Sequence, residues 1–282
     1  MANSPKGRRR QLDLASLVGL VLGLAGIVGG LLLEGGELKD IGQYTAAVIV
    51  FGGTFGAVLL STPWPVVRGA LRQLVRVFLD QPRSFEQAIE EVITYARKAR
   101  RVGVIGLEDD AYRIQDPFLR KALILAVDGT DLSDLKTTME LEITQEAQRR
   151  EAEARVFEAA GGFAPTIGII GAVLGLIQVM KNLADIEQVG HGIAVAFVAT
   201  VYGVGSANLL FLPAANKIRA RAHHEAELRR LMLLGVIGIV EGLNPRLLRG
   251  RLEAFLQQEL RRSEERERPQ DWSHISAAQS AG

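Results

Sequence analysis

Four apolar runs, each free of Asp, Glu, Lys and Arg, constrain this chain more than any other feature. They are Leu14–Leu33, Ile41–Leu60, Gly161–Met180 and His191–Ala215. A helix rises about 1.5 Å per residue, so about 20 apolar residues cross a hydrocarbon core about 30 Å thick. Runs this long and this uniformly apolar are not typical of buried helices in soluble proteins. The sequence therefore predicts an all-α integral membrane protein with four transmembrane helices.

Basic residues near the ends of these runs predict the orientation of the chain. They precede the first and third runs and follow the second and fourth, whereas the short connections Glu34–Asp40 and Ala184–Gly190 are acidic, with Lys39 as their only basic residue. Because Lys and Arg concentrate on the cytoplasmic side of membrane proteins, we expect both termini and the long middle segment to be cytoplasmic. The basic residues are Lys6, Arg8, Arg9, Arg10, Arg68, Arg72, Arg76, Arg149, Arg150, Arg155, Lys217, Arg219 and Arg221.

The middle segment has the patterns of a helical domain. Residues Ser84–Arg101 place apolar side chains at helical spacing with charges opposite, and Phe118–Val127 repeats this pattern before a turn at Asp128–Asp131. A long amphipathic helix from Ser133 to Ala160 is expected to continue into the third run. The fourth run is expected to continue as a charged helix over Lys217–Leu234.

A shorter apolar stretch, Leu231–Val240, is only about half as long as a span. It fits either a packed cytoplasmic helix or an element on the membrane surface.

Composition excludes several classes of function. The chain has no cysteine, which excludes disulfides, cysteine-bound metal and a cysteine nucleophile. Its net charge of +1 argues against nucleic acid as the main partner. Phosphate-loop, nucleophile-elbow and zinc-protease motifs are missing, and His223 and His224 are adjacent in a helical pattern, where neighbours face different ways. We therefore expect neither an enzyme nor a cofactor or metal site.

Small residues recur at four-residue spacing within the apolar runs. Gly171 and Gly175 share a helix face in the third run, as do Ala199, Gly203 and Ala207 in the fourth. Gly19 with Gly23 and Gly26 with Gly30 follow the same rule in the first run. Small residues at this spacing let helix backbones approach each other in lipid, so the pattern predicts helix association.

The four runs carry no ionisable residue near mid-membrane, although a proton path needs a titratable carrier. Their polar side chains are neutral and can line a wet path or form hydrogen bonds between helices. If the chain conducts ions, another chain must supply the carboxylate. The neutral polar residues are Thr166, Thr200, Tyr202, Ser206 and Asn208.

Several motifs, in order over about Leu14–Phe255, resemble the flagellar stator subunits of the MotA/PomA family. The segment Ala164–Ile177 (APTIGIIGAVLGLI) is similar to the third span of that family, and Ala194–Gly203 (AVAFVATVYG) to the fourth. Shorter matches are Gly52-Gly53-Thr54, Asp116–Lys121 with Asp128-Gly129-Thr130, and Glu241-Gly242 with Asn244-Pro245.

The resemblance implies a set of partners and a torque-generating function. In that family, five A subunits surround two MotB-like B subunits, and each B subunit brings one span with a proton-binding Asp. Ion flow is thought to turn the ring, and charges of the cytoplasmic domain push on the rotor protein FliG. Matching motifs place those charges at Glu108 and at Arg100 or its neighbour Arg101.

The resemblance also assigns residues to the ion path and to conformational coupling. Pro165 and Pro213 match two family prolines, each of which is expected to act as a hinge, although a static kink is the alternative. Sodium-driven relatives have Thr seven residues after the first of these prolines, where this chain has Ala172. A methyl group cannot replace sodium's water, so we expect proton coupling. Thr200 matches a threonine shared by both types.

The expected organisation is that of a bacterial inner-membrane protein. It comprises a basic cytoplasmic N-terminus over residues 1–11, spans over 12–33, 41–60, 161–183 and 191–213, periplasmic loops over 34–40 and 184–190, a cytoplasmic helical domain over 61–160, a cytoplasmic helical region over 214–260 and a disordered tail over 261–282.

Alternative functions remain open at this point. An ExbB/TolQ-like channel subunit is the nearest, although such chains typically have three spans and an external N-terminus. A sodium-driven PomA-like stator is a second. A secondary transporter would show inverted repeats and an internal ionisable residue, which are not visible. Composition does not exclude a purely structural membrane scaffold, and only the match to the stator motifs argues against it.

Overall fold

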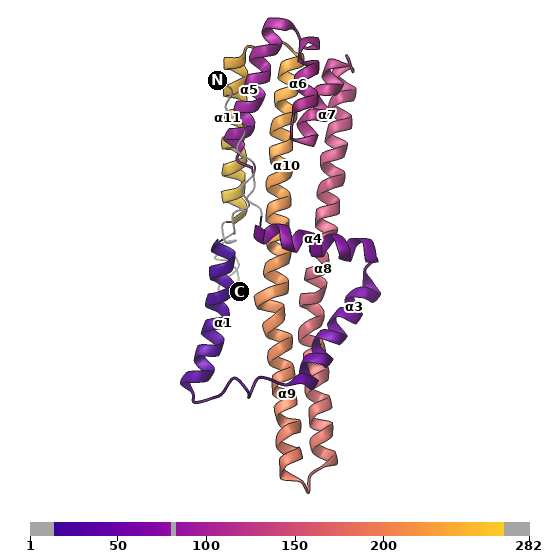
Figure 1. The fold of residues 1–282 in the computed structure, drawn as a ribbon, viewed down its shortest axis with the longest axis vertical. Helices are drawn as coiled ribbons and strands as arrows, with labels where there is room; N and C mark the ends of the chain where they lie inside the picture. The colour runs from indigo at the N-terminus through magenta and orange to yellow at the C-terminus, as the bar shows by residue number, and fades with distance from the viewer. Residues whose placement is uncertain (1–13, 80–82, 268–282) are drawn as a thin grey trace, which may run out of the picture. The chain divides into compact units, whose positions relative to one another are not determined.

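The computed structural model describes residues 14–79 and 83–267, and within these ranges every regular element is a helix. The chain forms two compact units, which are described separately (Figure 1). The first unit contains the described residues up to 79 and residues 145–224. The second contains residues 83–144 and the described residues from 225 onward. The predicted basic N-terminus, 1–11, and residues 268–282 of the predicted tail lie outside the described residues.

Two very long helical segments supply parts of both units. Helix α8 runs without interruption over Leu132–Lys181, and the segment Ile186–Val240 is helical throughout. At about 1.5 Å per residue, each is well over twice as long as a hydrocarbon core is thick. Each apolar run therefore continues into a charged helix, as the sequence predicted, because neither junction carries a turn signal strong enough to end the helix.

The first unit contains the apolar helices. Besides residues 145–181 of α8 and 212–224 of α10 (Leu212–Val240), its elements are α1 (Leu14–Leu33), α2 (Tyr44–Ala47), the π-helix η1 (Val48–Gly52), α3 (Gly53–Ser61), α4 (Trp64–Leu79), α9 (Ile186–Ser206) and the π-helix η3 (Ala207–Phe211). Three segments of the described chain are long and apolar enough to cross a membrane: Tyr44–Ser61 and parts of the two long segments. The apolar helix over Leu17–Leu33 is shorter by the same measure.

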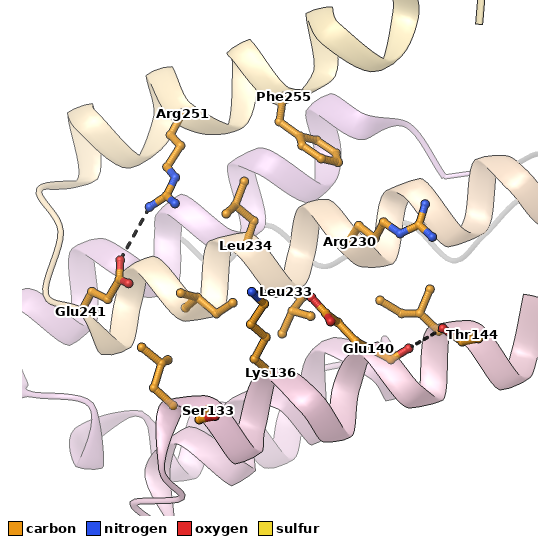
Figure 2. A pocket seen from close by; sticks show the side chains of 13 residues that line it. Ser133, Lys136, Glu140, Thr144, Arg230, Leu233, Leu234, Glu241, Arg251 and Phe255 are labelled. Atoms are coloured by element: carbon orange, nitrogen blue, oxygen red, sulfur yellow. Dashed lines mark hydrogen bonds and ion pairs between the residues drawn. The ribbon is translucent and has the colours of Figure 1, made fainter. Parts of the chain in front are cut away.

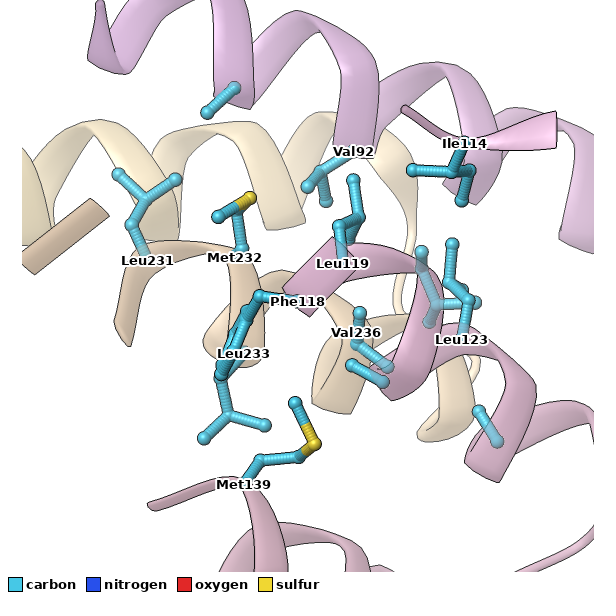
Figure 3. Packing of buried hydrophobic residues seen from close by; sticks show 14 of the residues in the cluster. Val92, Ile114, Phe118, Leu119, Leu123, Met139, Leu231, Met232, Leu233 and Val236 are labelled. Carbon is cyan, nitrogen blue, oxygen red and sulfur yellow. The ribbon is translucent and has the colours of Figure 1, made fainter. Parts of the chain in front are cut away.

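The second unit is a helical bundle with its own core. Its elements are residues 132–144 of α8, residues 225–240 of α10 (Leu212–Val240), α5 (Phe85–Val102), the 3₁₀ turn η2 (Ile105–Leu107), α6 (Glu108–Arg113), α7 (Pro117–Val127) and α11 (Pro245–Glu267). Figure 3 shows side chains from α5, α7, α8 and α10 converging, with Leu119, Met139 and Leu231 fully buried. Because Met232, Leu233 and Val236 are buried here too, Leu231–Val240 is a packed helix.

Local signals explain where the helices of this unit begin and end. The Ser84 hydroxyl accepts a hydrogen bond from the Gln87 N–H and caps α5. Gly103 ends that helix at φ +79°, a conformation that costs little only without a Cβ. Asp116 caps α7 by accepting hydrogen bonds from the N–H groups of Phe118 and Leu119, with Pro117 in the first turn.

The compact second unit differs from the continuous 61–160 segment expected from the sequence. Its core pairs the middle segment with the chain after residue 225, while residues 61–79 and 145–160 belong to the first unit. A period in the sequence reports which face of a helix is apolar and not which distant helix covers it. Helix α11 also extends to Glu267, seven residues past the expected end at 260.

Candidate functional site

The apolar halves of α8 and α9 form a close backbone-to-backbone pair. A Cβ added at Gly203 would lie 2.5 Å from the carbonyl oxygen of Ala164, and one added at Gly175 would lie 2.6 Å from that of Gly192. One added at Gly171 would lie 2.7 Å from the Cβ of Ala199. Only glycine fits at these distances, so the small residues of the third and fourth runs do bring helix backbones together, and the structure identifies α8 and α9 as the partners.

This pair brings together three of the four residues assigned to the ion path. The Cα of Thr200 lies 3.5 Å from the Cβ position of Gly168. Gly168 is about one helical turn from both Pro165 and Ala172 on α8. Pro165 and Ala172 are half-buried, whereas Thr200 is exposed in the isolated chain. The structure therefore gathers Pro165, Ala172 and Thr200 on one stretch of the pair.

Pro213 lies on α10, the helix that continues the segment of α9 beyond η3. Its neighbour Leu212 packs against Gly161, whose added Cβ would lie 2.7 Å from Leu212 Cδ2. Gly161 precedes Pro165 by four residues, so its carbonyl loses the hydrogen bond that Pro165 cannot donate. Pro213 likewise follows the π-helix η3, where the regular helical hydrogen bonds are already shifted. Near this contact, α8 therefore lacks one helix hydrogen bond, and the other long segment contains a π-helix followed by a proline.

Most of the neutral polar side chains bond to their own helix. Thr200 donates to the Ala196 carbonyl at 3.2 Å, and Asn208 to the Val204 carbonyl at 2.9 Å. Thr166 donates to Phe163 in the same way, at 2.8 Å. The Tyr202 hydroxyl is different, because it reaches the Ile41 carbonyl across the unit. Ile41 lies in the turn before α2, so this bond joins α9 to a loop, and among the described residues the bonds of these side chains do not join one helix to another.

The apolar halves of α8 and α9 provide neutral side chains but no Asp, Glu, Lys or Arg that could carry a proton. Neither Gly161–Met180 nor His191–Ala215 contains an Asp, Glu, Lys or Arg. In the part of the chain that the structure describes, no cluster of three or more His, Asp or Glu side chains could hold a metal ion. Taken alone, this surface can shape a path but cannot bind and release a proton.

The candidate rotor-facing charges lie in the second unit. Arg100 and Arg101 are in the last turn of α5, and Glu108 begins α6. All three are exposed, and none pairs with an opposite charge among residues 14–79 and 83–267. Nearby Lys98, in contrast, pairs with Asp110. The free charges are therefore available to a partner.

A buried ion cluster on α8 was not identified from the sequence, where its residues count as solvated helix charges. Glu153 is only 2% exposed, and its Oε2 accepts from Arg150 Nη1 at 2.9 Å. Arg150 also reaches Glu146 at 2.6 Å and donates to the side-chain oxygen of Gln73 on α4. A glycine opposite makes this burial possible, because a Cβ at Gly69 would lie 2.5 Å from Glu153 Oε1. The only hint in the sequence was the apolar pattern of α4, which indicates that one face of that helix is covered by another part of the chain.

A second ion cluster joins α8 to α10. Arg219 donates to both oxygens of Glu151, at 3.0 and 3.2 Å for Oε1 and 3.1 Å for Oε2, and also pairs with Glu158. Hydrogen bonds from Arg219 hold the pKa of Glu151 below its usual value, against the opposing effect of burial. This cluster ties the two long helices together just beyond their apolar halves.

The second unit also has a groove of about 790 Å³ between α8, α10 and α11 (Figure 2). Its floor is apolar, with Leu233, Leu234 and Phe255, and its rim is charged. Arg251 on the rim lies 3.6 Å from Glu241. The groove has no arrangement of a nucleophile and a base, so it does not suggest catalysis.

Comparison with known families agrees with this geometry. A model of the MotA/TolQ/ExbB proton channel family matches residues 110–231, and a model of the Motility protein A N-terminal region matches residues 17–102. A curated relative, Motility protein A of Bacillus subtilis, is 32% identical over 87% of this chain and 91% of its own length.

Two solved structures have the same fold. One, the structure of C. jejuni MotAB, superposes with a TM-score of 0.82 at 31% identity over 86% of this chain and 96% of the other. The second, the flagellar MotAB stator complex from Bacillus subtilis, gives a TM-score of 0.78 at 31% identity, over 86% and 95%.

Fold and site together define a subunit of the membrane-embedded, ion-driven channel class, and not an enzyme. Within that class, the chain belongs to the motility protein A family of flagellar stator subunits. The match to the Motility protein A N-terminal model favours this family over the ExbB/TolQ alternative, in accordance with the first hairpin of apolar runs.

Proposed function

We propose that this chain, as a flagellar stator subunit, assembles with a MotB-like subunit and that the complex converts ion flow into torque. The observation that carries the proposal is the tightly packed α8–α9 pair, whose apolar halves carry no ionisable group. The two similar solved structures are both of MotAB, which supports a B partner. The B subunit would bring a single span with the titrating Asp, and several copies of this chain would form a ring around it.

The proposed placement is in the bacterial inner membrane, with four spans and both termini in the cytoplasm. Three candidate spans support it, together with α1, whose side chains at Leu17, Leu22 and Ile27 are exposed as expected for a helix facing lipid or another chain. The second unit would then be cytoplasmic, because it follows the basic end of the second span. Cysteine labelling of intact cells at residue 37 and at residue 109 tests this orientation: only the first should react with an impermeant reagent.

The proposed coupling ion is the proton. Ala172 offers a methyl group on α8 where a sodium path would need an oxygen ligand, and the nearby Thr200 hydroxyl is engaged by its own helix. Cells that swim with this chain and its B partner should keep their speed when sodium is replaced by potassium and should stop when a protonophore is added. Swimming that stops on sodium removal and survives the protonophore would contradict proton coupling.

The proposed rotor contact uses Glu108 and one of Arg100 and Arg101. Exposed ion pairs are typically worth under about 1 kcal/mol, so neutralising one charge should only slow swimming, whereas reversing it adds repulsion. We expect Glu108→Lys to reduce swimming at least severalfold, with normal complex assembly. Arg100→Glu and Arg101→Glu, compared side by side, identify the arginine that acts.

Arg246→Glu is the matched control for these variants, because Arg246 is an exposed arginine on another helix of the same unit. It should swim normally. Equal losses in Arg246→Glu and Glu108→Lys would indicate a general charge effect and would contradict a local rotor contact at FliG.

Pro165 and Pro213 are proposed as the steps at which the two long helices bend during each ion transfer. Their support is the helix hydrogen bond that neither proline can donate, the π-helix η3 that ends just before Pro213, and the contact between Gly161 and Leu212. Substituting either proline with alanine restores a helix hydrogen bond and should lower torque more than it lowers complex stability.

A further inference from the structure

Helix α4 has one face that is fixed to its own unit. Val67 and Ala70 are buried in a core with Ala154 and Phe157 of α8. Gln73 accepts a hydrogen bond from the half-buried Arg150, and the carbonyl of Arg76 accepts one from Arg221 at 2.6 Å. The helix is thus held along most of its length, and the orientation of its other face is determined.

The opposite face of α4 is both apolar and basic. Trp64, Leu71 and Val75 are 62%, 52% and 56% exposed and lie on one stripe at helical spacing. Beside that stripe runs a row of exposed arginines at four-residue spacing. These are Arg68, Arg72 and Arg76.

Among the described residues, the arginines of this row have no ion-pair partner. Helix α4 contains no Asp or Glu, and none of the three forms an ion pair with any residue in the described ranges 14–79 and 83–267. Elsewhere in the same unit, Arg150 and Arg219 are each held by two carboxylates. Within the described ranges, the row therefore presents positive charge that no carboxylate pairs, beside an apolar stripe.

The position of α4 relative to the candidate spans determines the surroundings of its exposed face. The helix begins at Trp64, directly after α3 ends at Ser61, and α3 completes a candidate span. Figure 1 shows α4 running across α8 and not along it. If α8 crosses the bilayer, α4 lies along the surface of the leaflet at the end of the second span. Beside its first turn opens a groove of about 390 Å³, lined partly by Pro63, Val66 and Phe163.

We propose that the exposed face of α4 binds anionic phospholipids of this leaflet. Trp64, Leu71 and Val75 insert at the boundary of headgroups and acyl chains, where tryptophan and aliphatic side chains of interfacial helices lie. The three arginines contact lipid phosphates, for which a planar guanidinium is well suited. The inference rests on the proposed placement of the spans and is independent of the coupling ion and of the rotor contact.

Quenching of Trp64 fluorescence by brominated lipids tests this inference on the complete complex of A and B subunits. The complex is reconstituted into phosphatidylcholine–phosphatidylglycerol vesicles in which one lipid or the other is brominated, and the signal of a Trp64→Phe complex is subtracted. From about 1 kcal/mol per basic residue, we expect the relative association constant for phosphatidylglycerol to exceed ten at low salt. Raising the salt concentration should reduce it.

Two matched variants locate the effect. The triple variant Arg68→Gln/Arg72→Gln/Arg76→Gln should bring the relative association constant close to one. Another triple variant, Arg97→Gln/Arg113→Gln/Arg246→Gln, removes the same charge from exposed arginines of the second unit and should leave the constant unchanged.

Each other result has a definite reading. Equal quenching by the two brominated lipids, at low salt and in the wild-type complex, overturns the lipid preference and leaves the placement of the spans intact. If neither brominated lipid quenches Trp64, the lipid preference and the placement of the spans are both overturned. That result would point instead to a protein on this face. If the first triple variant does not assemble, the salt dependence of the wild-type complex decides.

Discussion

Replacing Gly203 with alanine is expected to break the close pairing of α8 with α9 and to abolish a working stator. The added Cβ would lie 2.5 Å from the Ala164 carbonyl oxygen and 3.1 Å from the Gly168 Cα. Both are backbone atoms, so neither can rotate away as a flexible side chain would. Overpacking of this kind costs about 1–3 kcal/mol, and in lipid close packing is itself a main source of helix association.

The same substitution should also impair the proposed hinge, because Ala164 directly precedes Pro165. Thermal stability of the purified complex and swimming speed are the measurements, and we expect a lower melting temperature and a loss of motility. Gly205→Ala is the matched control, since a Cβ there meets nothing within 4 Å. A Gly203→Ala complex as stable as the Gly205→Ala complex would contradict the close pair.

Removing Arg150 should be the most destabilising change outside the apolar helices. Arg150→Met leaves Glu153, which is 2% exposed, without its 2.9 Å partner. A buried charge deprived of its partner typically costs about 3–5 kcal/mol. The loss should appear as a lower melting temperature of the complex, and replacing Glu153 with methionine in the same chain should restore part of it.

Arg149→Met is the control for this prediction. Arg149 lies 3.4 Å from the other oxygen of Glu153, but its own side chain is 62% exposed. Exposed pairs contribute about 0–1 kcal/mol, so its loss should cost little. If both single variants lowered the melting temperature equally, the stability of the complex would depend on the total charge around Glu153 and not on its pairing with Arg150.

The sequence could predict the helices well because each is defined by a local pattern. The capped start of α5 at Ser84 and its end near Gly103 follow from side chains within a few residues. The continuity of α8 from charged to apolar residues could be read in the same way, since no turn signal separates the two halves. The spacing of Gly171 and Gly175 also predicted helix association, although it did not identify the partner helix.

What the sequence could not supply was long-range pairing. The second unit combines residues 83–144 with residues beyond 225, and no local pattern encodes that contact. Arg68, Arg72 and Arg76 served only as markers of orientation, whereas the structure places them on one face of α4. Likewise, the burial of Glu153 depends on Gly69 of another helix. The residues proposed for the ion path were assigned by resemblance, and only the fold shows that the Cα of Thr200 lies against Gly168.

Proton flux through vesicles containing this chain, with and without its B partner, tests the central claim most directly. The claim is that a neutral A subunit shapes the path while another polypeptide supplies the group that titrates. After an imposed pH gradient, vesicles with the chain alone should hold the gradient as well as empty vesicles, and vesicles with the complex should lose it faster. Rapid loss of the gradient with the chain alone would contradict the claim.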